Sequence, residues 1–109
     1  MFSTEKIGKI YTKYMINLFN NELALIRWNP KVQTPIHNHG NKLCNFYILG
    51  GTLNEVKYKE KSIHSLTTSH TLTSFKKNTV DISEYHQIFN LDNVKKWSIH
   101  YYYEPVDKL

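Results

Sequence analysis

The chain has 109 residues, a length that suits one domain with a single hydrophobic core. Hydrophobic residues make up 40% of it and charged residues 21%, and the 8 Tyr, 5 Phe and 2 Trp favour strands in a globular protein. The net charge of +5 comes from scattered lysines, and the single arginine, Arg27, argues against the clustered basic face of a nucleic-acid-binding protein.

The N-terminal segment predicts a short helix. Ser3 or Thr4 can cap a helix over residues 5–10, and the helical spacing places Ile7 and Ile10 on one face. The helix would be brief, because the residues that follow are rich in aromatic and branched side chains.

A β-hairpin is expected next. Asn20-Asn21 separates two runs of strand-like composition, residues 11–19 and 22–28, and so predicts a two-residue turn between them. Further strands are predicted over residues 33–38, 42–49, 52–59, 65–73, 79–82, 84–90 and 96–103.

Short strands at regular spacing, with polar turns between them, predict an all-β barrel or double-sheet sandwich. We expect residues 1–109 to form one domain, with its core over about residues 11–105. The last residues, 105–109, are expected to be a frayed tail.

Two histidines lie one residue apart, His37 and His39, in a segment with strand composition. Side chains two residues apart in a strand point to the same face, so both imidazoles could bind one transition metal. The alternative is a pair of structural or surface histidines. His86, which opens an alternating run late in the chain, is the candidate third ligand. Three neutral imidazoles would leave positions open for a substrate and dioxygen.

The last predicted strand carries a second polar pattern. Ser98, His100 and Tyr102 share one face by period two. They could form a mixed polar wall, or a hydrogen-bonded relay that aims the Tyr102 phenol at the metal. His64 and His70 lie in a stretch rich in threonine and serine and are expected at the surface.

The single cysteine, Cys44, excludes an internal disulfide and suits a reducing compartment. The polar start of the chain lacks the apolar core of a signal peptide, and no apolar run approaches the roughly 18 residues of a membrane span. We therefore expect a cytoplasmic, monomeric protein that binds neither membranes nor nucleic acid.

Several motifs follow one another in a fixed order. His37-x-His39 is followed by Cys44 and, after six residues, by Gly51, and His86-x3-Asn90 comes later. Over residues 11–105 this order resembles the cupins and, within them, the cysteine dioxygenase (thiol dioxygenase) family, with Cys44 where the general cupin motif has a glutamate. Further local matches are Trp28, Pro35-Ile36-His37, Leu49-x-Gly51-x-Leu53-x-Glu55 and Ser98-x-His100-x-Tyr102.

The resemblance implies a cupin barrel (a double-stranded β-helix) that binds Fe(II) through His37, His39 and His86. It implies a role in cysteine catabolism, in which L-cysteine binds the iron through its thiolate and amine. Dioxygen would take the remaining position, and both oxygen atoms would go to sulfur to give the sulfinic acid.

The resemblance also assigns the residues around the iron. Cys44 and Tyr102 look like the pair that joins through a thioether in animal-type members. Ser98 and His100 look like the residues that position this tyrosine.

One position departs from the family pattern. Tyr11-x-Lys13 stands where the family has Tyr-x-Arg, so Lys13, helped by Tyr11, would hold the substrate carboxylate as a point charge. The lysine leaves room for another thiol, such as 3-mercaptopropionate, cysteamine or a peptide N-terminal cysteine, and it could also be an ordinary surface residue. A metal-binding cupin without oxygenase activity, serving as a sensor or interaction module, is the alternative from a different class.

Overall fold

A computed structural model describes residues 2–104, and of residues 2–7 only the backbone. Strands account for most of these residues, and the one helix among them is the single 3-10 turn η1 (Ile63–Ser65). The strands are β1 (Phe2–Ile7), β2 (Tyr11–Leu18), β3 (Asn21–Trp28), β4 (Val32–Gln33), β5 (Leu43–Ile48), β6 (Leu53–Tyr58), β7 (Leu66–Leu72), β8 (Asn78–Val80), β9 (Tyr85–Asn90) and β10 (Lys96–Tyr103).

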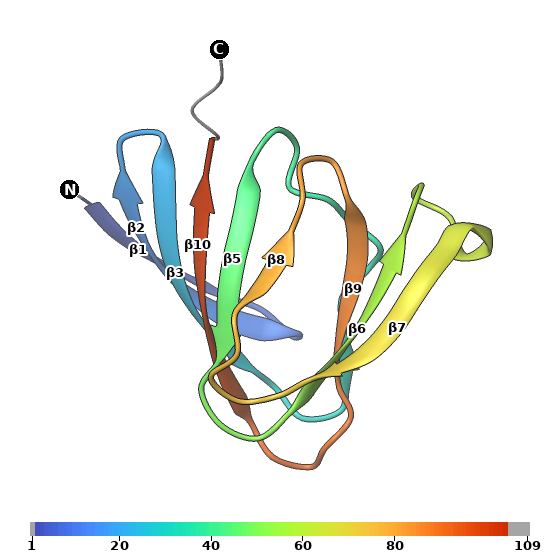
Figure 1. The fold of residues 1–109 in the computed structure, drawn as a ribbon. Coiled ribbons are helices and arrows are strands. Elements are labelled where there is room, and N and C mark those ends of the chain that lie inside the picture. The colour runs from blue at the N-terminus through green and yellow to red at the C-terminus, as the bar shows by residue number, and fades with distance from the viewer. Residues whose placement is uncertain (1, 105–109) are drawn as a thin grey trace.

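The strands form two sheets that face each other (Figure 1). One sheet has six strands in the order β1-β2-β3-β10-β5-β8, and the other has four in the order β4-β9-β6-β7. Neighbouring strands within both sheets are antiparallel. The prediction of an all-β barrel is confirmed.

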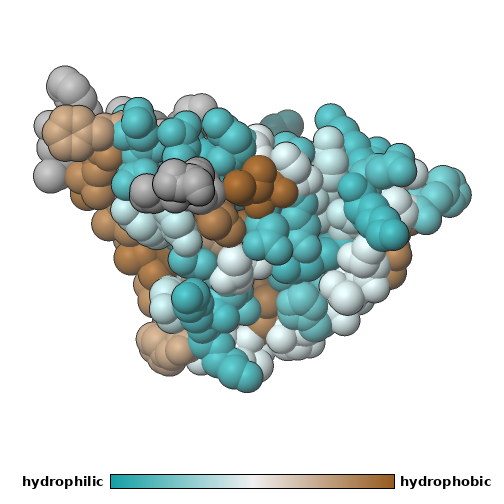
Figure 2. Space-filling view, turned by 45° about the horizontal axis from the view of Figure 1, so that its top comes forward, coloured by the Kyte–Doolittle hydropathy of each residue, from teal (hydrophilic) through white to brown (hydrophobic). Residues whose placement is uncertain are grey.

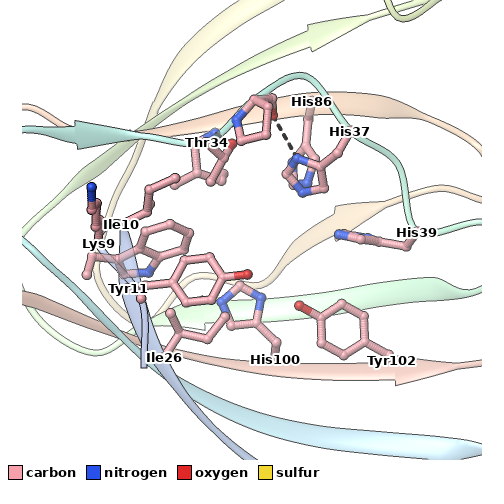
Figure 3. Close-up of a pocket in the computed structure, with 14 residues that line it drawn as sticks. Lys9, Ile10, Tyr11, Ile26, Thr34, His37, His39, His86, His100 and Tyr102 are labelled. Carbon is pink, nitrogen blue, oxygen red and sulfur yellow. Dashed lines mark hydrogen bonds between the residues drawn. The ribbon is translucent and has the colours of Figure 1, made fainter. Parts of the chain in front are cut away.

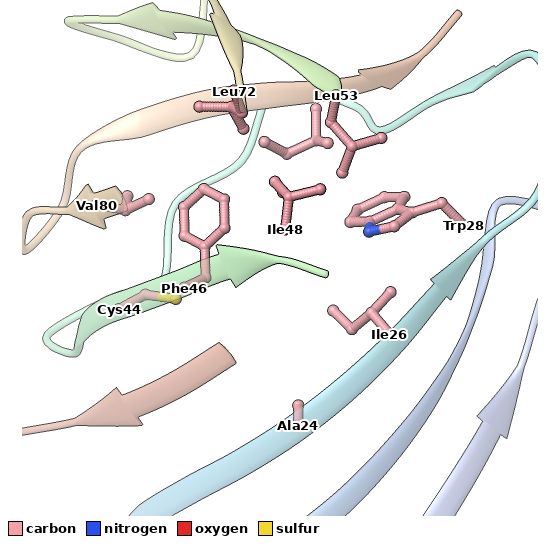
Figure 4. Packing of buried hydrophobic residues seen from close by; sticks show 10 residues of the cluster. Ala24, Ile26, Trp28, Cys44, Phe46, Ile48, Leu53, Leu72 and Val80 are labelled. Carbon is pink, nitrogen blue, oxygen red and sulfur yellow. The ribbon is translucent and has the colours of Figure 1, made fainter. Parts of the chain in front are cut away.

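The core lies between the sheets because alternate side chains of each strand point inward (Figure 4). In β3 the buried residues are Ala24, Ile26 and Trp28, and in β5 they are Cys44, Phe46 and Ile48. Each large apolar side chain removed from water contributes about 1.5–3 kcal/mol to folding. The other sheet and β8 complete this cluster with Leu53, Leu72, Val80 and Ile88.

The predicted hairpin between residues 11–19 and 22–28 is confirmed as β2 and β3. Its turn lies one residue earlier than expected, at Phe19-Asn20, because Leu18 pairs with Asn21. Phe19 adopts a φ of 60° in this turn, and its side chain is fully exposed although it is apolar.

The helix predicted over residues 5–10 is wrong. Ile7 ends strand β1, which pairs along its whole length with β2, and residues 8–10 form the connection between the two strands. A six-residue helix gains too few internal hydrogen bonds to offset its nucleation, whereas pairing with β2 joins β1 to a six-stranded sheet.

The strand predicted over residues 33–38 is also wrong in most of its length. Only Val32 and Gln33 pair with β9 as β4, because Pro35 has no N–H to donate to a ladder. Beyond it the chain touches β9 again at one isolated bridge, between His37 and His86. The expected tail over residues 105–109 lies outside the described residues.

Hydrophilic side chains cover much of the molecule in the view of Figure 2, and hydrophobic ones gather at its left, over the strands nearest the N-terminus. No helix in the described part of the chain is long and apolar enough to cross a membrane.

Candidate metal centre

Three histidines meet inside the barrel, as the sequence predicted, although an ordinary strand does not bring them together (Figure 3). His37 and His86 exchange both backbone hydrogen bonds, at 3.1 and 2.8 Å, and this bridge sets their rings side by side with centroids 4.6 Å apart. The ring of His39 lies 5.1 Å from that of His86. One ring nitrogen from each histidine lies within 4.8 Å of the others.

Hydrogen bonds orient two of the three imidazoles. Nδ1 of His37 lies 2.9 Å from the carbonyl of Pro35, and Nδ1 of His86 lies 2.8 Å from Oε2 of Glu55. A carbonyl or carboxylate oxygen accepts a hydrogen bond, so in each ring Nδ1 carries the hydrogen and Nε2 keeps its lone pair. Such outer partners are what fixes the tautomer of a metal-binding histidine.

The ring nitrogens left over fit a metal ion. Nε2 of His86 and Nδ1 of His39 are buried, and neither has a hydrogen-bond partner among the described residues. A buried nitrogen without a partner is costly, and a metal bound at that lone pair removes the cost. Three neutral nitrogen donors suit a divalent transition metal.

The environment keeps two of these imidazoles, His37 and His39, neutral. Burial, followed by the nearby His86, His37 and Lys13, lowers the pKa of His39 to about 3. Burial also lowers the pKa of His37, against the opposing effect of the Pro35 carbonyl. Because a metal binds the neutral ring, these shifts remove proton competition at neutral pH.

Glu55 links the histidine cluster to the protein surface. Its side chain is 1% exposed, and its second oxygen, Oε1, lies 2.9 Å from Nε2 of His70. His70 is on the edge strand β7 and its side chain is 43% exposed, as the surface expectation required. The sequence analysis gave neither residue a role, although Glu55 lies two positions from the buried Leu53 and so on the same strand face.

The six-stranded sheet forms the opposite wall of the site. Tyr102 on β10 lies directly opposite Cys44 on β5 and, on its other side, opposite Glu22 on β3. The strand register thus brings the predicted cysteine–tyrosine pair together. The ring of Tyr102 is 5.1 Å from that of His39. Burial raises the pKa of the Cys44 thiol to about 12 and that of the Tyr102 phenol well above its usual value, so both groups stay protonated.

The expected relay is present in its first step only. Ser98 Oγ lies 2.6 Å from Nε2 of His100 and also accepts a 2.8 Å hydrogen bond from Nε1 of Trp28. His100 and Tyr102 stack with ring centroids 5.9 Å apart, and none of the hydrogen bonds in the described residues joins them. Nδ1 of His100 lies instead 3.8 Å from Sγ of Cys44. The hydrogen-bonded series therefore runs from Trp28 through Ser98 to His100.

Two adjoining cavities reach the histidines. The larger, about 440 Å³, is mostly apolar, and its walls include Ile10, Ile26, Trp28 and Ile88 beside the three histidines, His100 and Tyr102. The smaller, about 250 Å³, is lined by Tyr11, Lys13, Glu22, His37, His39, Lys42 and Tyr102. Tyr11 and Lys13 thus lie at the site, and Lys13 is not an isolated surface residue.

Sequence comparison identifies the family. A model of the family described as cysteine dioxygenase type I matches residues 8–109. The chain belongs to this family. Members of the cysteine dioxygenase type I family are dioxygenase-type enzymes, and the match covers every residue of the site described above.

Solved structures agree on the fold. The chain is similar to an oxalate decarboxylase of Lactobacillus farciminis (TM-score 0.78, 13% identity, covering 95% of this chain and 32% of that one). It is also similar to the cupin domain of Schizosaccharomyces pombe Cnp3 (TM-score 0.73, 10% identity, covering 86% of this chain and 61% of that one). A third similar structure is an oxalate oxidase (TM-score 0.67, 13% identity, covering 78% of this chain and 42% of that one). The chain thus spans less than half of either oxalate enzyme, and at these identities the likeness shows the cupin fold alone.

Proposed function

We propose that this member of the cysteine dioxygenase family is an iron-dependent thiol dioxygenase that oxidises a small thiol, with L-cysteine as the first candidate. The observation that supports it best is the cluster of three imidazoles, His37, His39 and His86, which faces Tyr102 and Cys44 across the cavity. Imidazole is a suitable ligand for iron, and three such donors leave coordination positions open.

The overall reaction balances as RS⁻ + O₂ → RSO₂⁻, in which both oxygen atoms are added to sulfur. Bound Fe(II) would lower the thiol pKa so that the thiolate binds at neutral pH, and would supply the redox chemistry of dioxygen. The protein's part is to position the substrate and to keep water from the sulfur.

Residues of the chain would do this in three ways. The apolar walls of the larger cavity, among them Ile26, Trp28 and Ile88, would exclude water from the reacting sulfur. The protonated Tyr102 hydroxyl would donate a hydrogen bond to the oxygen that gains charge, because its raised pKa keeps the proton in place. Lys13, with Tyr11 beside it, would be the residue that contacts a substrate carboxylate, and Glu22 shares its charge.

We further propose that Cys44 and Tyr102 join through a thioether. Their directly opposed positions on β5 and β10 support it. Forming the bond removes one hydrogen from the thiol and one from the phenol ring, and dioxygen would accept both hydrogens with their electrons and leave as hydrogen peroxide. Intact mass spectrometry of protein exposed to Fe(II), thiol and air should show the loss of two hydrogens, and Cys44→Ser should not. An unchanged mass in the wild-type protein would disprove the link.

The function is tested by loading the purified protein with Fe(II) and following dioxygen consumption with L-cysteine, 3-mercaptopropionate, cysteamine and a peptide with an N-terminal cysteine. We expect uptake that depends on the thiol and yields the sulfinic acid. Tight iron binding without uptake on any of these thiols would favour a metal-binding cupin that serves as a sensor or interaction module.

A further inference from the structure

The charge of Lys13 is already paired inside the site. Its Nζ lies 3.1 Å from Oε2 of Glu22, and the two side chains are only 18% and 23% exposed. Lys13 shares the inward face of β2 with Tyr11 and Met15, which pack on the core, and Glu22 shares the inward face of β3 with Ala24. The ion pair therefore lies within the barrel, where solvent screens it less than at the surface.

The pair also borders the space in which a substrate would bind. Both residues line the 250 Å³ cavity together with His37, His39 and Tyr102. Nζ of Lys13 is 5.0 Å from the centre of the Tyr102 ring, and Glu22 is the strand neighbour of Tyr102. A ligand that reaches the histidines through this cavity meets both charges at once.

Lys13 and Glu22 form the one lysine–carboxylate pair among the described residues that line this cavity. Lys42 is the other basic side chain there, and its Nζ donates a hydrogen bond to the backbone carbonyl of Asn20. Besides burial, the charges of Lys13 and Glu22 act on the Cys44 thiol in opposite directions: Lys13 lowers its pKa and Glu22 raises it. On this thiol the two charges therefore act against each other, and Lys13 has the larger effect.

We propose that Glu22 is a specificity-determining residue, which neutralises Lys13 and makes the site indifferent to a carboxylate on the thiol substrate. A substrate carboxylate would gain attraction to Lys13 but lose as much to repulsion by Glu22 at a similar distance. The substrate class is then small thiols with or without a carboxylate, aminothiols included. This inference rests on the proposed function.

The test compares two thiols of similar size, 3-mercaptopropionate, which carries a carboxylate, and 2-mercaptoethanol, which is neutral. Isothermal titration without oxygen measures their binding to the Fe(II)-loaded protein. In the wild-type protein the two dissociation constants should agree within about threefold. In Glu22→Gln, which keeps the side-chain shape, 3-mercaptopropionate should bind about tenfold tighter, a change of about 1.4 kcal/mol, while 2-mercaptoethanol is unaffected.

Two further variants isolate the cause. Adding Lys13→Met to Glu22→Gln should return 3-mercaptopropionate to its wild-type affinity, because both charges are then absent. Glu84→Gln is the matched control, because Glu84 pairs with Lys57 at the same 3.1 Å and similar exposure, 26% and 19%, yet lines neither cavity. It should change neither affinity.

Each outcome decides one claim. If both thiols bind but the ratio of their affinities is unchanged in Glu22→Gln, or the ratio changes equally in Glu84→Gln, the role of Glu22 is disproved and the proposed function is not. If no thiol binds the iron-loaded wild-type protein and none supports dioxygen uptake, the proposed function fails, and the selectivity of its site fails with it.

Discussion

The two sides of the site are built differently. On the histidine side, His37 and His86 are each held by a separate hydrogen-bond acceptor, the Pro35 carbonyl and the Glu55 carboxylate. On the opposite side, strand register makes Cys44 and Glu22 the neighbours of Tyr102. The first arrangement fixes ring tautomers and lone pairs, whereas the second fixes only which side chains are neighbours. We therefore expect changes on the histidine side to alter metal affinity, and changes on the opposite side to alter stability and substrate choice.

The largest effect is expected from removing a proposed ligand. His86→Ala deletes one of three donors and leaves Glu55 buried with one partner fewer, so metal affinity should fall by more than about 100-fold and dioxygen uptake should be lost. Metal content after dialysis, measured by plasma emission spectrometry, checks this. His64→Ala is the control, because His64 is exposed in η1, and it should bind metal as the wild type does. Normal metal content in His86→Ala would rule out the three-histidine site.

Replacing Glu55 should lower metal affinity less than removing a histidine ligand does, and more than replacing its outer partner His70. Glu55→Gln replaces the carboxylate that fixes His86, and metal affinity should fall by about 10- to 100-fold. His70→Gln changes only the outer contact of Glu55, on a half-exposed side chain, and should cost less than about threefold. Competition with a chelating dye measures both. Equal losses in the two variants would show that Glu55 does not act through His86.

The metal-free protein should lose stability in mild acid. Burial lowers the pKa of His39 to about 3 and holds that of His100 well below its usual range. In the unfolded chain both take up a proton near pH 6.5, so the unfolded state binds more protons and is favoured as pH falls. The free energy of unfolding in urea should fall by about 4 kcal/mol between pH 7 and pH 5, about 2 kcal/mol for each ring. A flat profile over that range would show that neither ring is kept neutral.

On the opposite side, Ser98→Ala should destabilise the fold. It leaves the indole N–H of Trp28 and Nε2 of His100 without their shared partner in the core, at a cost of about 1.5 kcal/mol. Urea unfolding of the two proteins measures the difference. Ser69→Ala, on the exposed face of β7, should stay within about 0.5 kcal/mol of the wild type. A loss no greater than that in Ser98→Ala would mean that the Trp28–Ser98–His100 chain is not formed.

The sequence predicted which residues meet at the site better than the backbone pairing that brings them together. His37, His39 and His86 converge as expected, but through a single bridge beyond Pro35, since proline ends the ladder that alternation had assumed. Strand periodicity placed Tyr102 on one face with Ser98 and His100, and the family resemblance paired it with Cys44. The register of β10 and β5 sets the two residues opposite each other.

What the sequence did not predict depends on pairing between distant strands. Glu55, His70 and His86 come from three strands, and the order of β9, β6 and β7 in their sheet cannot be read from any one of them. Glu22 lies two positions from the buried Ala24 and so on the inward face of β3, but a charged residue at the start of a strand is usually solvated. Its ion pair with Lys13 became visible only in the structure. The N-terminal helix failed because helical spacing was judged without its strand partner.

The most direct measurement of the central claim is dioxygen consumption by the Fe(II)-loaded protein with L-cysteine, followed by mass spectrometry of the product formed under ¹⁸O₂. Our account predicts uptake that requires both iron and thiol, and a sulfinic acid that carries two labelled oxygen atoms. Stoichiometric iron binding with no thiol-dependent uptake would contradict it.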